Sequence, residues 1–283
     1  MAETVALPEQ VSAQAYMKNL MVDADEDDDV RLHLAALCGD CEGLRQILAE
    51  PQSERWLDYR VRPYMSPSLR LGVSGGNPEC VKILLAAGAN IELEDVKGQT
   101  PLFVATSQRK TEIMKILLEA GANPEGSQKN RCCPLLVAVR DGYSEGVKLL
   151  LQHGADSEPF DQISTCVPGW PLHHAVVEHP EFVELYHECG GNLHQQNSAG
   201  ATCLQEFLDS SPAKNSLMIL SGLPLSLKSL CRVTLRQLLG RNKLVKLSSL
   251  DLPACLFPFL NFEEFSHHSS RFKENHHIRM HDK

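Results

Sequence analysis

A pattern that returns every 33 residues limits the fold of this chain more than any other feature of its sequence. Its fixed positions are a leucine early in each copy and a glycine near the end, at Leu69, Leu102 and Leu135 and at Gly88, Gly121 and Gly154. Self-similarity at this period indicates a repeat protein. Because one such unit cannot bury its own apolar face, we expect neighbouring units to stack and share a core.

Each copy contains the signals of two short helices. In the middle copy Thr100 precedes Pro101, a pair that suits a helix start because the hydroxyl can cap free amides and proline is tolerated at the first helical position. The second helix carries Ile113, Ile116 and Leu117 at the i, i+3, i+4 spacing of a buried stripe. The glycine that follows permits the left-handed backbone with which many helices end.

These units resemble ankyrin repeats in their period and in the segments Gln99-Thr100-Pro101-Leu102-Phe103-Val104-Ala105 and Glu119-Ala120-Gly121-Ala122. Weaker copies flank the three clear ones: one begins near Leu32, one near Pro171, and a partial one at Gly200. We therefore expect about six ankyrin units over residues 29–220, with degenerate outer copies.

Charge is distributed unevenly along the chain. Residues 1–224 hold 17 Lys and Arg against 31 Asp and Glu, whereas residues 225–283 hold 10 against 5. The acidic front argues against nucleic acid as the partner of the repeats. Residues 1–28 are expected to be a disordered acidic leader, because the acids from Asp23 to Asp29 leave too little apolar surface to fold. The leader is either a solvated tail or an arm that contacts a partner.

The sequence also predicts the cellular compartment of the protein. Its N-terminus lacks the basic start and apolar stretch of a signal peptide, and no apolar run approaches the roughly 20 residues that cross a bilayer. The ten cysteines lack the even spacing of a secreted disulfide framework. We expect a protein of the cytoplasm, or also of the nucleus, that contacts no membrane.

A helix of another kind is predicted after the repeats, starting at Ser226 and stopping at Gly240. One face of this segment is apolar, with Leu227, Cys231 and Leu235 joined by Leu230, Leu238 and Leu239. Another face is basic, with Lys228, Arg232 and Arg236. An apolar face this wide needs a partner, which is either the last repeat or another protein.

The segment Ser226-Leu227-x-x-x-Cys231-x-x-x-Leu235 resembles the Elongin C-binding box of SOCS-box proteins, the substrate receptors of cullin–RING ubiquitin ligases. Downstream, the segment from Leu250 to Leu260 is similar to the cullin-5 box. Repeats followed by this element resemble the ankyrin repeat and SOCS box family over residues 30–260, with members one and twelve nearest. The resemblance implies an all-α fold, an ankyrin-repeat solenoid followed by a C-terminal three-helix SOCS box at residues 221–261.

The resemblance further implies which residues bind each partner. The Elongin C contacts are Leu227, Leu230, Cys231 and Leu235, and the cullin contacts are Leu250, Leu252, Pro253 and Leu256. The chain departs from the family pattern at Asp251, which replaces a proline, and at Pro258, which would fall inside a helix expected to begin at Pro253. Because an interior proline costs about 3 kcal/mol, cullin contacts through Phe259 and Leu260 are in doubt.

A target protein is expected at the tips and inner face of the repeats, the concave side of such a stack. Candidate contacts are Asp95, Lys97, Lys129, Arg131, Phe160 and Trp170. Trp170 and Arg131 are favoured because Trp and Arg dominate the energetics of interfaces. Each candidate is otherwise a solvated residue or one that packs on a cap.

Catalytic and metal sites are not predicted. Cys38-Gly39-Asp40-Cys41 has CxxC spacing, but no second pair supplies the other ligands of a zinc site. His173-His174 stands where ankyrin repeats commonly place a structural histidine. The His-rich tail at residues 262–283, also expected to be disordered, specifies no metal geometry. The sequence contains no phosphate-binding glycine loop and no HExxH.

We therefore expect a non-catalytic adaptor without a cofactor. Its repeats would hold a target protein, and its C-terminal box would recruit Elongin B/C and cullin-5 with a RING partner. Two alternatives stay open: a scaffold or inhibitor that recruits no ligase, and an enzyme or metal protein that uses the Cys and His residues.

Overall fold

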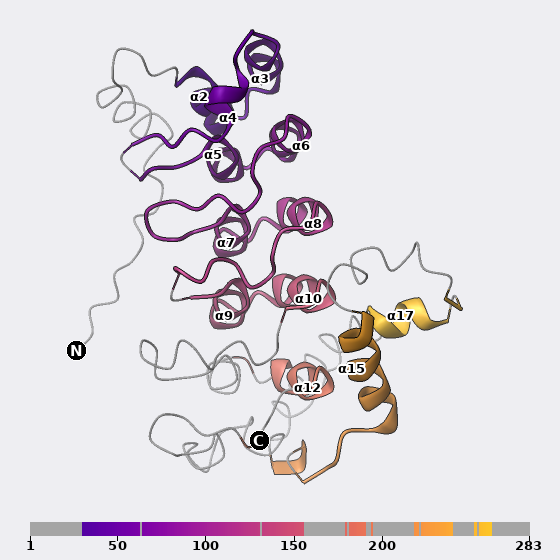
Figure 1. The fold of residues 1–283 in the computed structure, drawn as a ribbon. Helices are drawn as coiled ribbons and strands as arrows, with labels where there is room; N and C mark the ends of the chain where they lie inside the picture. Colours follow the sequence, from indigo (N-terminus) through magenta and orange to yellow (C-terminus); the bar gives the residue numbers. More distant parts are fainter. Residues whose placement is uncertain are drawn as a thin grey trace, which may run out of the picture. The chain divides into compact units, whose positions relative to one another are not determined.

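The computed structural model describes residues 30–62, 64–130, 132–155, 179, 181–190, 194, 218–220, 222–239, 252–253 and 255–261. The chain divides into two compact units, residues 1–130 and residues 131–283, and each is described by itself. The regular elements named below are helices, labelled in Figure 1. The expected leader at residues 1–28 and the expected tail at residues 262–283 lie outside the described residues.

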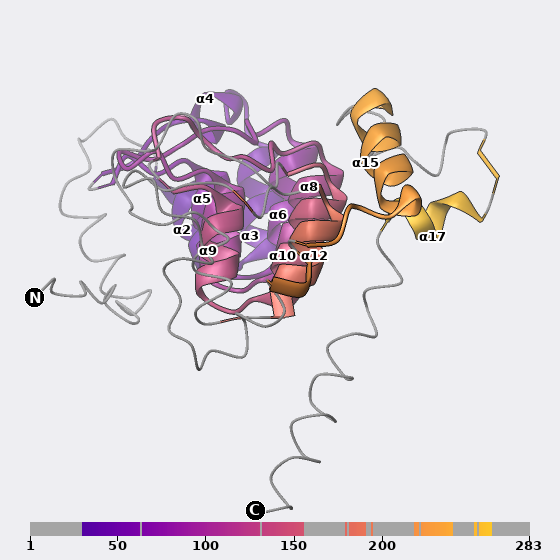
Figure 2. The ribbon, with the colours of Figure 1, turned by 90° about the horizontal axis from the view of Figure 1, so that it is seen from below.

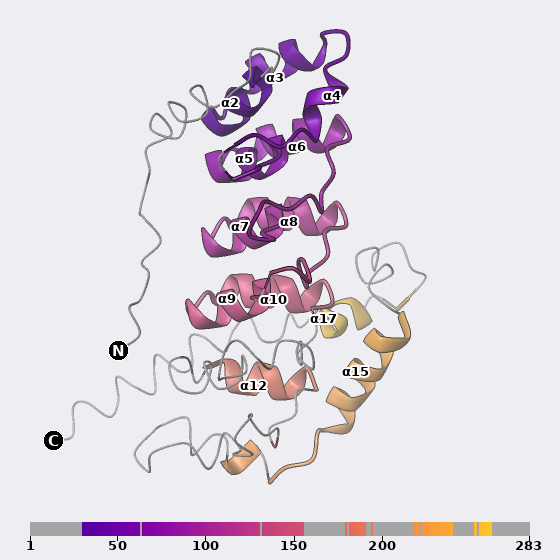
Figure 3. The same ribbon diagram turned by 60° about the vertical axis from the view of Figure 1, so that its left-hand side comes forward.

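The first unit contains three helix pairs. Its helices are α2 (Arg31–Cys38), α3 (Cys41–Leu48), α4 (Glu54–Leu57), α5 (Ser68–Gly75), α6 (Pro78–Ala86), α7 (Pro101–Ser107) and α8 (Thr111–Glu119). The first helices of the pairs, α2, α5 and α7, pack in one row, and α3, α6 and α8 pack in a second row (Figures 1 and 3). The short helix α4 lies in the connection that lengthens the spacing between the first two copies. These stacked pairs are the repeats that the 33-residue period predicts.

The ends of the third pair are set by the residues that the sequence indicates. Thr100 Oγ1 accepts a hydrogen bond from the Phe103 amide at 3.3 Å, and Pro101 begins α7. After α8, Gly121 has a φ of 96°. This left-handed backbone costs glycine little but costs other residues roughly 1–2 kcal/mol.

The core of the first unit is formed by the apolar faces of both rows. In α8 the predicted stripe is right for Ile113 and Leu117, which are buried. Ile116 is only half-buried, because the buried face of α8 turns toward Met114 and Leu118. A fully buried aliphatic side chain of this size contributes roughly 1.5–3 kcal/mol, so the stacking of such faces supplies most of the stability of the unit.

In its described residues, the second unit contains a fourth helix pair, a single repeat helix, a short helical segment at residues 218–220 and two C-terminal helices. The labelled helices are α9 (Pro134–Arg140), α10 (Ser144–Gln152), α12 (Glu181–Glu188), α15 (Leu227–Leu239) and α17 (Leu256–Leu260). Cys133 takes the capping place before α9, since its Sγ accepts a hydrogen bond from the Leu136 amide at 3.3 Å. The first helix of the fifth copy, expected from Pro171, and the sixth copy, expected from Gly200, lie outside the described residues.

The C-terminal helices α15 and α17 contact each other (Figure 2). Residues 240–251, between them, are outside the described part, so a box of three helices stays a prediction. Within the described ranges, no helix is both long and apolar enough to cross a bilayer.

Candidate partner-binding site

The helix after the repeats starts where the sequence predicts. Ser226 Oγ accepts a hydrogen bond from the Ser229 amide at 3.1 Å, which satisfies one of the free amides at the helix start. α15 then runs for 13 residues, or about four turns. A helix of this length presents well-separated faces along its whole surface.

The apolar face of α15 is open to solvent. Leu227 is 77% exposed and Leu238 is 76% exposed, and the residues between them on this face are exposed as well. We call this face the leucine stripe: Leu227, Leu230, Cys231, Leu235 and Leu238. The structure therefore does not support the alternative in which these leucines pack on the last repeat. An amphipathic helix normally buries such a stripe, and an exposed one marks a surface for a partner.

On the basic face of α15, Arg232 is buried and Arg236 is half-buried, whereas Lys228 is exposed. Arg232 has no exposed surface. Its Nε donates to the Phe259 carbonyl at 2.9 Å, its guanidinium lies 4.6 Å from the centre of the Phe259 ring, and Nη1 lies 3.6 Å from Glu188 Oε2. A buried arginine is tolerated only with such partners, because removing its charge from water costs several kcal/mol.

Arg236 joins α15 to the ends of two other helices. Its Nη1 donates to the Leu260 carbonyl at 2.6 Å, and its Nη2 donates to the carbonyls of Leu151 and, at 3.0 Å, Gln152. These carbonyls belong to the last turns of α17 and α10, where oxygens lack helical donors and the helix dipole favours a cation. Burial lowers the pKa of Arg236 to about 10, so the side chain stays protonated at neutral pH.

Arg232 and Arg236 together explain why the leucine stripe faces outward. They bind α15 to α10, α12 and α17 through its basic face, as the placement of α15 beside α12 and α17 illustrates (Figure 3). Sequence reasoning found the two faces but did not assign this role to the arginines. The available signal was their i, i+4 spacing, which places both on the face away from Leu227.

Pro258 is accommodated because α17 starts later than expected. The helix begins at Leu256 rather than at Pro253, so Pro258 is its third residue. At that position a backbone N–H would have no helical acceptor, and the carbonyl four residues earlier lies outside the helix. The predicted cost of an interior proline is therefore wrong for this segment.

The side chains around α17 form a small core of their own. Leu260 is buried, and the half-buried apolar residues packed against it are Leu239, Leu252, Leu256, Phe257 and Phe259. Phe259 and Leu260 thus face their own chain, which agrees with the doubt about them as cullin contacts. Of the predicted cullin contacts, Pro253 is exposed and Leu252 and Leu256 are half-buried, and Leu250 lies outside the described residues.

The candidate target surface requires one correction. Asp95 is only 4% exposed, and its carboxylate accepts hydrogen bonds from the amides of Lys97 and Gln99 at 2.8 and 2.9 Å. The same carboxylate lies 2.9 Å from an Arg70 nitrogen. Asp95 therefore holds a turn of the repeat together, and it is not available to a partner as predicted.

The other candidates divide between exposed lysines and residues that the structure does not describe. Lys97 is exposed. Lys129 is exposed too, and its amine forms an ion pair with Glu94. Hydrogen bonds from Lys129 and Ser127 lower the pKa of the Glu94 carboxyl. Arg131, Phe160 and Trp170 lie outside the described residues.

The cysteine pair of the first repeat lies at a turn next to a third cysteine. Cys38 and Cys41 lie on either side of the turn between α2 and α3, and the Cys41 Sγ is 2.9 Å from Cys80 Sγ. Burial, together with the hydrogen bond to Cys41, raises the pKa of the Cys80 thiol to about 12. Across the described ranges, no cluster of three or more His, Cys, Asp or Glu residues could hold a metal ion. His173 and His174 lie outside those ranges.

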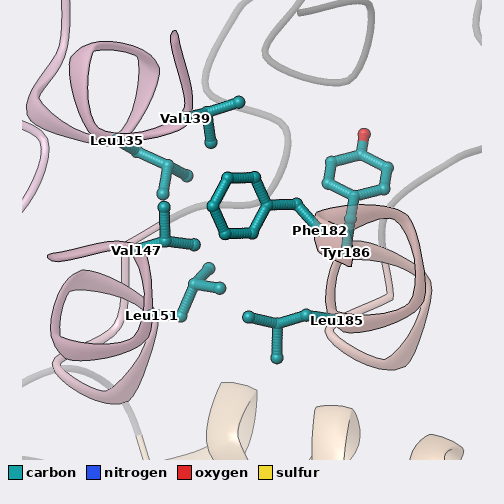
Figure 4. Close-up of a pocket in the computed structure, with 7 residues that line it drawn as sticks. All are labelled: Leu135, Val139, Val147, Leu151, Phe182, Leu185 and Tyr186. Carbon is teal, nitrogen blue, oxygen red and sulfur yellow. The ribbon is translucent and has the colours of Figure 1, made fainter. Parts of the chain in front are cut away.

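A small gap lies between α12 and the α9–α10 pair (Figure 4). Its walls are apolar: Leu135, Val139, Val147, Leu151, Phe182, Leu185 and Tyr186. Phe182 fills its centre, and the Tyr186 hydroxyl points away from it (Figure 4). Without polar groups to orient a ligand, the gap is a feature of repeat packing and not a binding site.

Comparisons with known proteins match both halves of this description. A family model of ankyrin repeats, in three copies, matches residues 69–161, and a SOCS box model matches residues 223–261. Ankyrin repeat and SOCS box protein 11 of Mus musculus is 32% identical over 201 residues, which cover 71% of this chain and 50% of the relative. Ankyrin repeat and SOCS box protein 1 of Mus musculus is 37% identical over 81 residues, or 27% of this chain and 24% of the relative.

Among solved structures, an ankyrin repeat domain from Acinetobacter baumannii shares the fold. It superposes with a TM-score of 0.60 at 23% identity, covering 69% of this chain and 99% of the other. This likeness concerns the fold alone. The matches to the two curated relatives span a quarter to a half of the length of those proteins.

Proposed function

We propose that this chain is a member of the ankyrin repeat and SOCS box family, to which its matches point, and that it is a non-catalytic substrate-recognition adaptor of a cullin-5 ubiquitin ligase. The repeats hold a target protein, and the C-terminal box binds Elongin B/C and then cullin-5 with its RING partner. The chemistry of ubiquitin transfer belongs to those partners. The adaptor accelerates it by raising the local concentration of the target.

The observation that carries the proposal is the orientation of α15. Its basic face is bound by the chain itself, whereas the leucine stripe is exposed at both ends, at Leu227 and Leu238. Burying a leucine side chain yields roughly 1.5–3 kcal/mol, so a protein that covers several of these residues gains a substantial part of its binding energy. We assign this role to Elongin C, with Leu227, Leu230, Cys231 and Leu235 as contacts and Leu238 as an extension.

The proposed cullin contacts follow from the small core around α17. Leu252, Pro253 and Leu256 lie at its partly exposed side, and Leu250 completes the set from the sequence. A proline inside the helix of the cullin box would slightly favour the scaffold alternative, and the place of Pro258 in the first turn of α17 removes this support. The predicted kinship to member twelve stays a prediction.

Co-expression with Elongin B and Elongin C, followed by size-exclusion chromatography, tests the proposal. We expect the wild type to co-elute with both Elongins and the double variant Leu227→Ala/Cys231→Phe to elute alone as a folded protein. The matched control is Gln237→Ala, an exposed position on the same helix outside the stripe, which should co-elute like the wild type. Soluble wild-type protein that elutes without the Elongins would contradict the ligase role.

Addition of cullin-5 to the purified ternary complex tests the second contact. We expect Leu252→Ala/Pro253→Ala to keep both Elongins but to lose cullin-5. Loss of the Elongins in this variant would show that the substitutions disturb α15 through the shared core. Undiminished cullin-5 binding would exclude these residues as the cullin contact.

A further inference from the structure

Two turns of the first unit carry apolar side chains that the repeats do not bury. The first finger, residues 58–67, is closed by hydrogen bonds between Val61 and Ser66 at 3.1 and 2.9 Å, and it exposes Tyr64 and Met65 at its tip. Met65 has a φ of 50°, a left-handed conformation that costs a side-chain-bearing residue roughly 1–2 kcal/mol. The tip of the first finger therefore contains a strained backbone conformation.

The second finger, residues 91–100, lies against the first. The amide of Val96 donates to the Tyr64 carbonyl at 3.1 Å, and Lys97 Nζ lies 5.6 Å from the centre of the Tyr64 ring. Val96 itself is 60% exposed. The two fingers thus form one continuous tip surface, whose residues are Arg62, Tyr64, Met65, Val96 and Lys97.

The charge at this surface is basic, although the first 224 residues are acidic as a whole. The two carboxylates of the second finger that lie nearest its tip already have bases of their own: Glu94 pairs with Lys129, and Asp95 pairs with Arg70. Exposed Arg62 and Lys97 are therefore not neutralised by these two acids. An occupant of the tip surface should be acidic and should carry apolar side chains for Tyr64, Met65 and Val96.

The segment that directly precedes the repeats has this composition. Residues 20–22 are Leu-Met-Val, and residues 23–29 hold six acids in seven positions. The segment ends beside the first finger, because Val30 packs with Tyr59 against Val61 and Leu71.

The reach of the segment suffices. Tyr64 is three residues from Val61, or at most about 11 Å along the chain, whereas ten residues before Val30 can span up to about 35 Å. The order of the residues also fits, since the acids lie nearest the point of attachment and Leu20 to Val22 farther out.

We propose that the tip surface is a docking site for the chain's own acidic segment, residues 20–29. The acids meet Arg62 and Lys97, and the apolar residues cover Tyr64, Met65 and Val96. Because the segment is attached next to its site, its effective concentration there is high. Any partner that uses the tip surface must displace it. This docking does not depend on whether the C-terminal box recruits a ligase.

Zero-length carbodiimide cross-linking of the dilute full-length chain, followed by mass spectrometry, tests the proposal. The reagent joins a carboxylate to a lysine amine that it contacts, so Lys97 is a built-in reporter, and Arg62→Lys supplies a second one with the charge kept. We expect residues 23–29 to link to Lys97 and to the introduced lysine at least tenfold more than to Lys115, an exposed lysine of α8. The yield should fall several-fold in 0.5 M salt, because exposed charges are screened.

Variants separate docking from chance contact. Tyr64→Ser/Met65→Ser removes the apolar part of the site at exposed positions and should lower the yield at Lys97 at least threefold. A mixture of isotope-labelled and unlabelled chains distinguishes links within one molecule from links between two. Yields at Lys97 and position 62 no higher than at Lys115, or links found only between molecules, would overturn the proposal.

Discussion

The helices α8 and α15 each have one apolar face and one charged face, but they bury opposite faces. α8 buries Ile113, Met114, Leu117 and Leu118 and exposes its charges, as the outer helix of a repeat should. α15 buries Arg232, half-buries Arg236 and exposes leucines at 227 and 238. The difference lies in what each helix packs against. α8 meets apolar helix faces, whereas the two arginines of α15 meet carbonyl oxygens, a carboxylate and one aromatic ring.

An amphipathic pattern indicates that a helix has two different faces, but it does not indicate which face packs against the rest of the chain. A helix end offers carbonyls that a guanidinium satisfies well, and α10 and α17 both present such ends to α15. This packing leaves the leucine stripe of α15 exposed. The predictions that follow test whether the two helices differ in this way.

The largest expected effect is on stability. Leu117→Ala in α8 should lower the free energy of unfolding by about 2–5 kcal/mol, because it removes a fully buried side chain and leaves a cavity. Leu238→Ala in α15 should change it by less than about 0.5 kcal/mol, as expected for an exposed position. Urea denaturation followed by circular dichroism measures both. Equal losses would mean that the stripe is buried after all.

The second-largest loss of stability is expected on removal of the Arg236 side chain. Arg236→Met keeps much of the volume but removes three charged hydrogen bonds, each worth about 1.5–3 kcal/mol when an ion is involved. Methionine carries no charge, so the variant avoids the free-energy cost of removing an ion from water, and this offsets part of the loss. We therefore expect a net loss of stability of about 2–3 kcal/mol, concentrated in α15. Hydrogen exchange should show faster exchange of the α15 amides, with Gln237→Met as the control. Unchanged exchange would contradict the positioning role.

Removal of the N-cap of a repeat helix or of the N-cap of α15 should lower stability by a similar and smaller amount. Thr100 and Ser226 each accept a hydrogen bond from an amide three residues ahead, and loss of such a cap costs about 1 kcal/mol. Thr100→Ala and Ser226→Ala should therefore lower stability by comparable amounts in thermal denaturation. A neutral Ser226→Ala would indicate that the arginines alone hold α15.

The smallest effect concerns acid pH. Hydrogen bonds from Lys129 and Ser127 lower the pKa of Glu94 below its unfolded value near 4.5. The stability from this pairing is therefore present above about pH 4.5 and is lost as the pH falls through the folded pKa. Lys129 is exposed, so the contribution should stay below about 1 kcal/mol. Lys129→Ala should flatten the decline of the melting temperature between pH 5 and pH 3, and a decline as steep as in the wild type would exclude the pairing as its cause.

The repeats were predictable from the sequence because their signals are local. The period, the Thr100-Pro101 start and Gly121 each act within one or two turns of chain. Ile116 was assigned too much burial, since the exact orientation of α8 depends on its neighbours. The turn residue Asp95 was mistaken for a surface contact, because its bond to Arg70 joins positions far apart in the sequence.

The candidate site was predictable in outline only. The leucine stripe follows from spacing, but the burial of Arg232 and Arg236 depends on Glu188, Leu151 and Leu260, which no local pattern connects to α15. The start of α17 was misplaced for the same reason, since Leu260 is fixed by packing rather than by a cap. Long-range contacts account for each of these differences.

The most direct test of the account is a paired measurement on one set of samples: affinity for purified Elongin B/C and melting temperature. The set is the wild type, Leu227→Ala and Leu117→Ala. The account predicts at least tenfold weaker binding at an unchanged melting temperature for Leu227→Ala, and a lowered melting temperature for Leu117→Ala. Wild-type affinity in Leu227→Ala, or a loss of stability as large as that of Leu117→Ala, would contradict the claim that the exposed leucines of α15 are a partner surface.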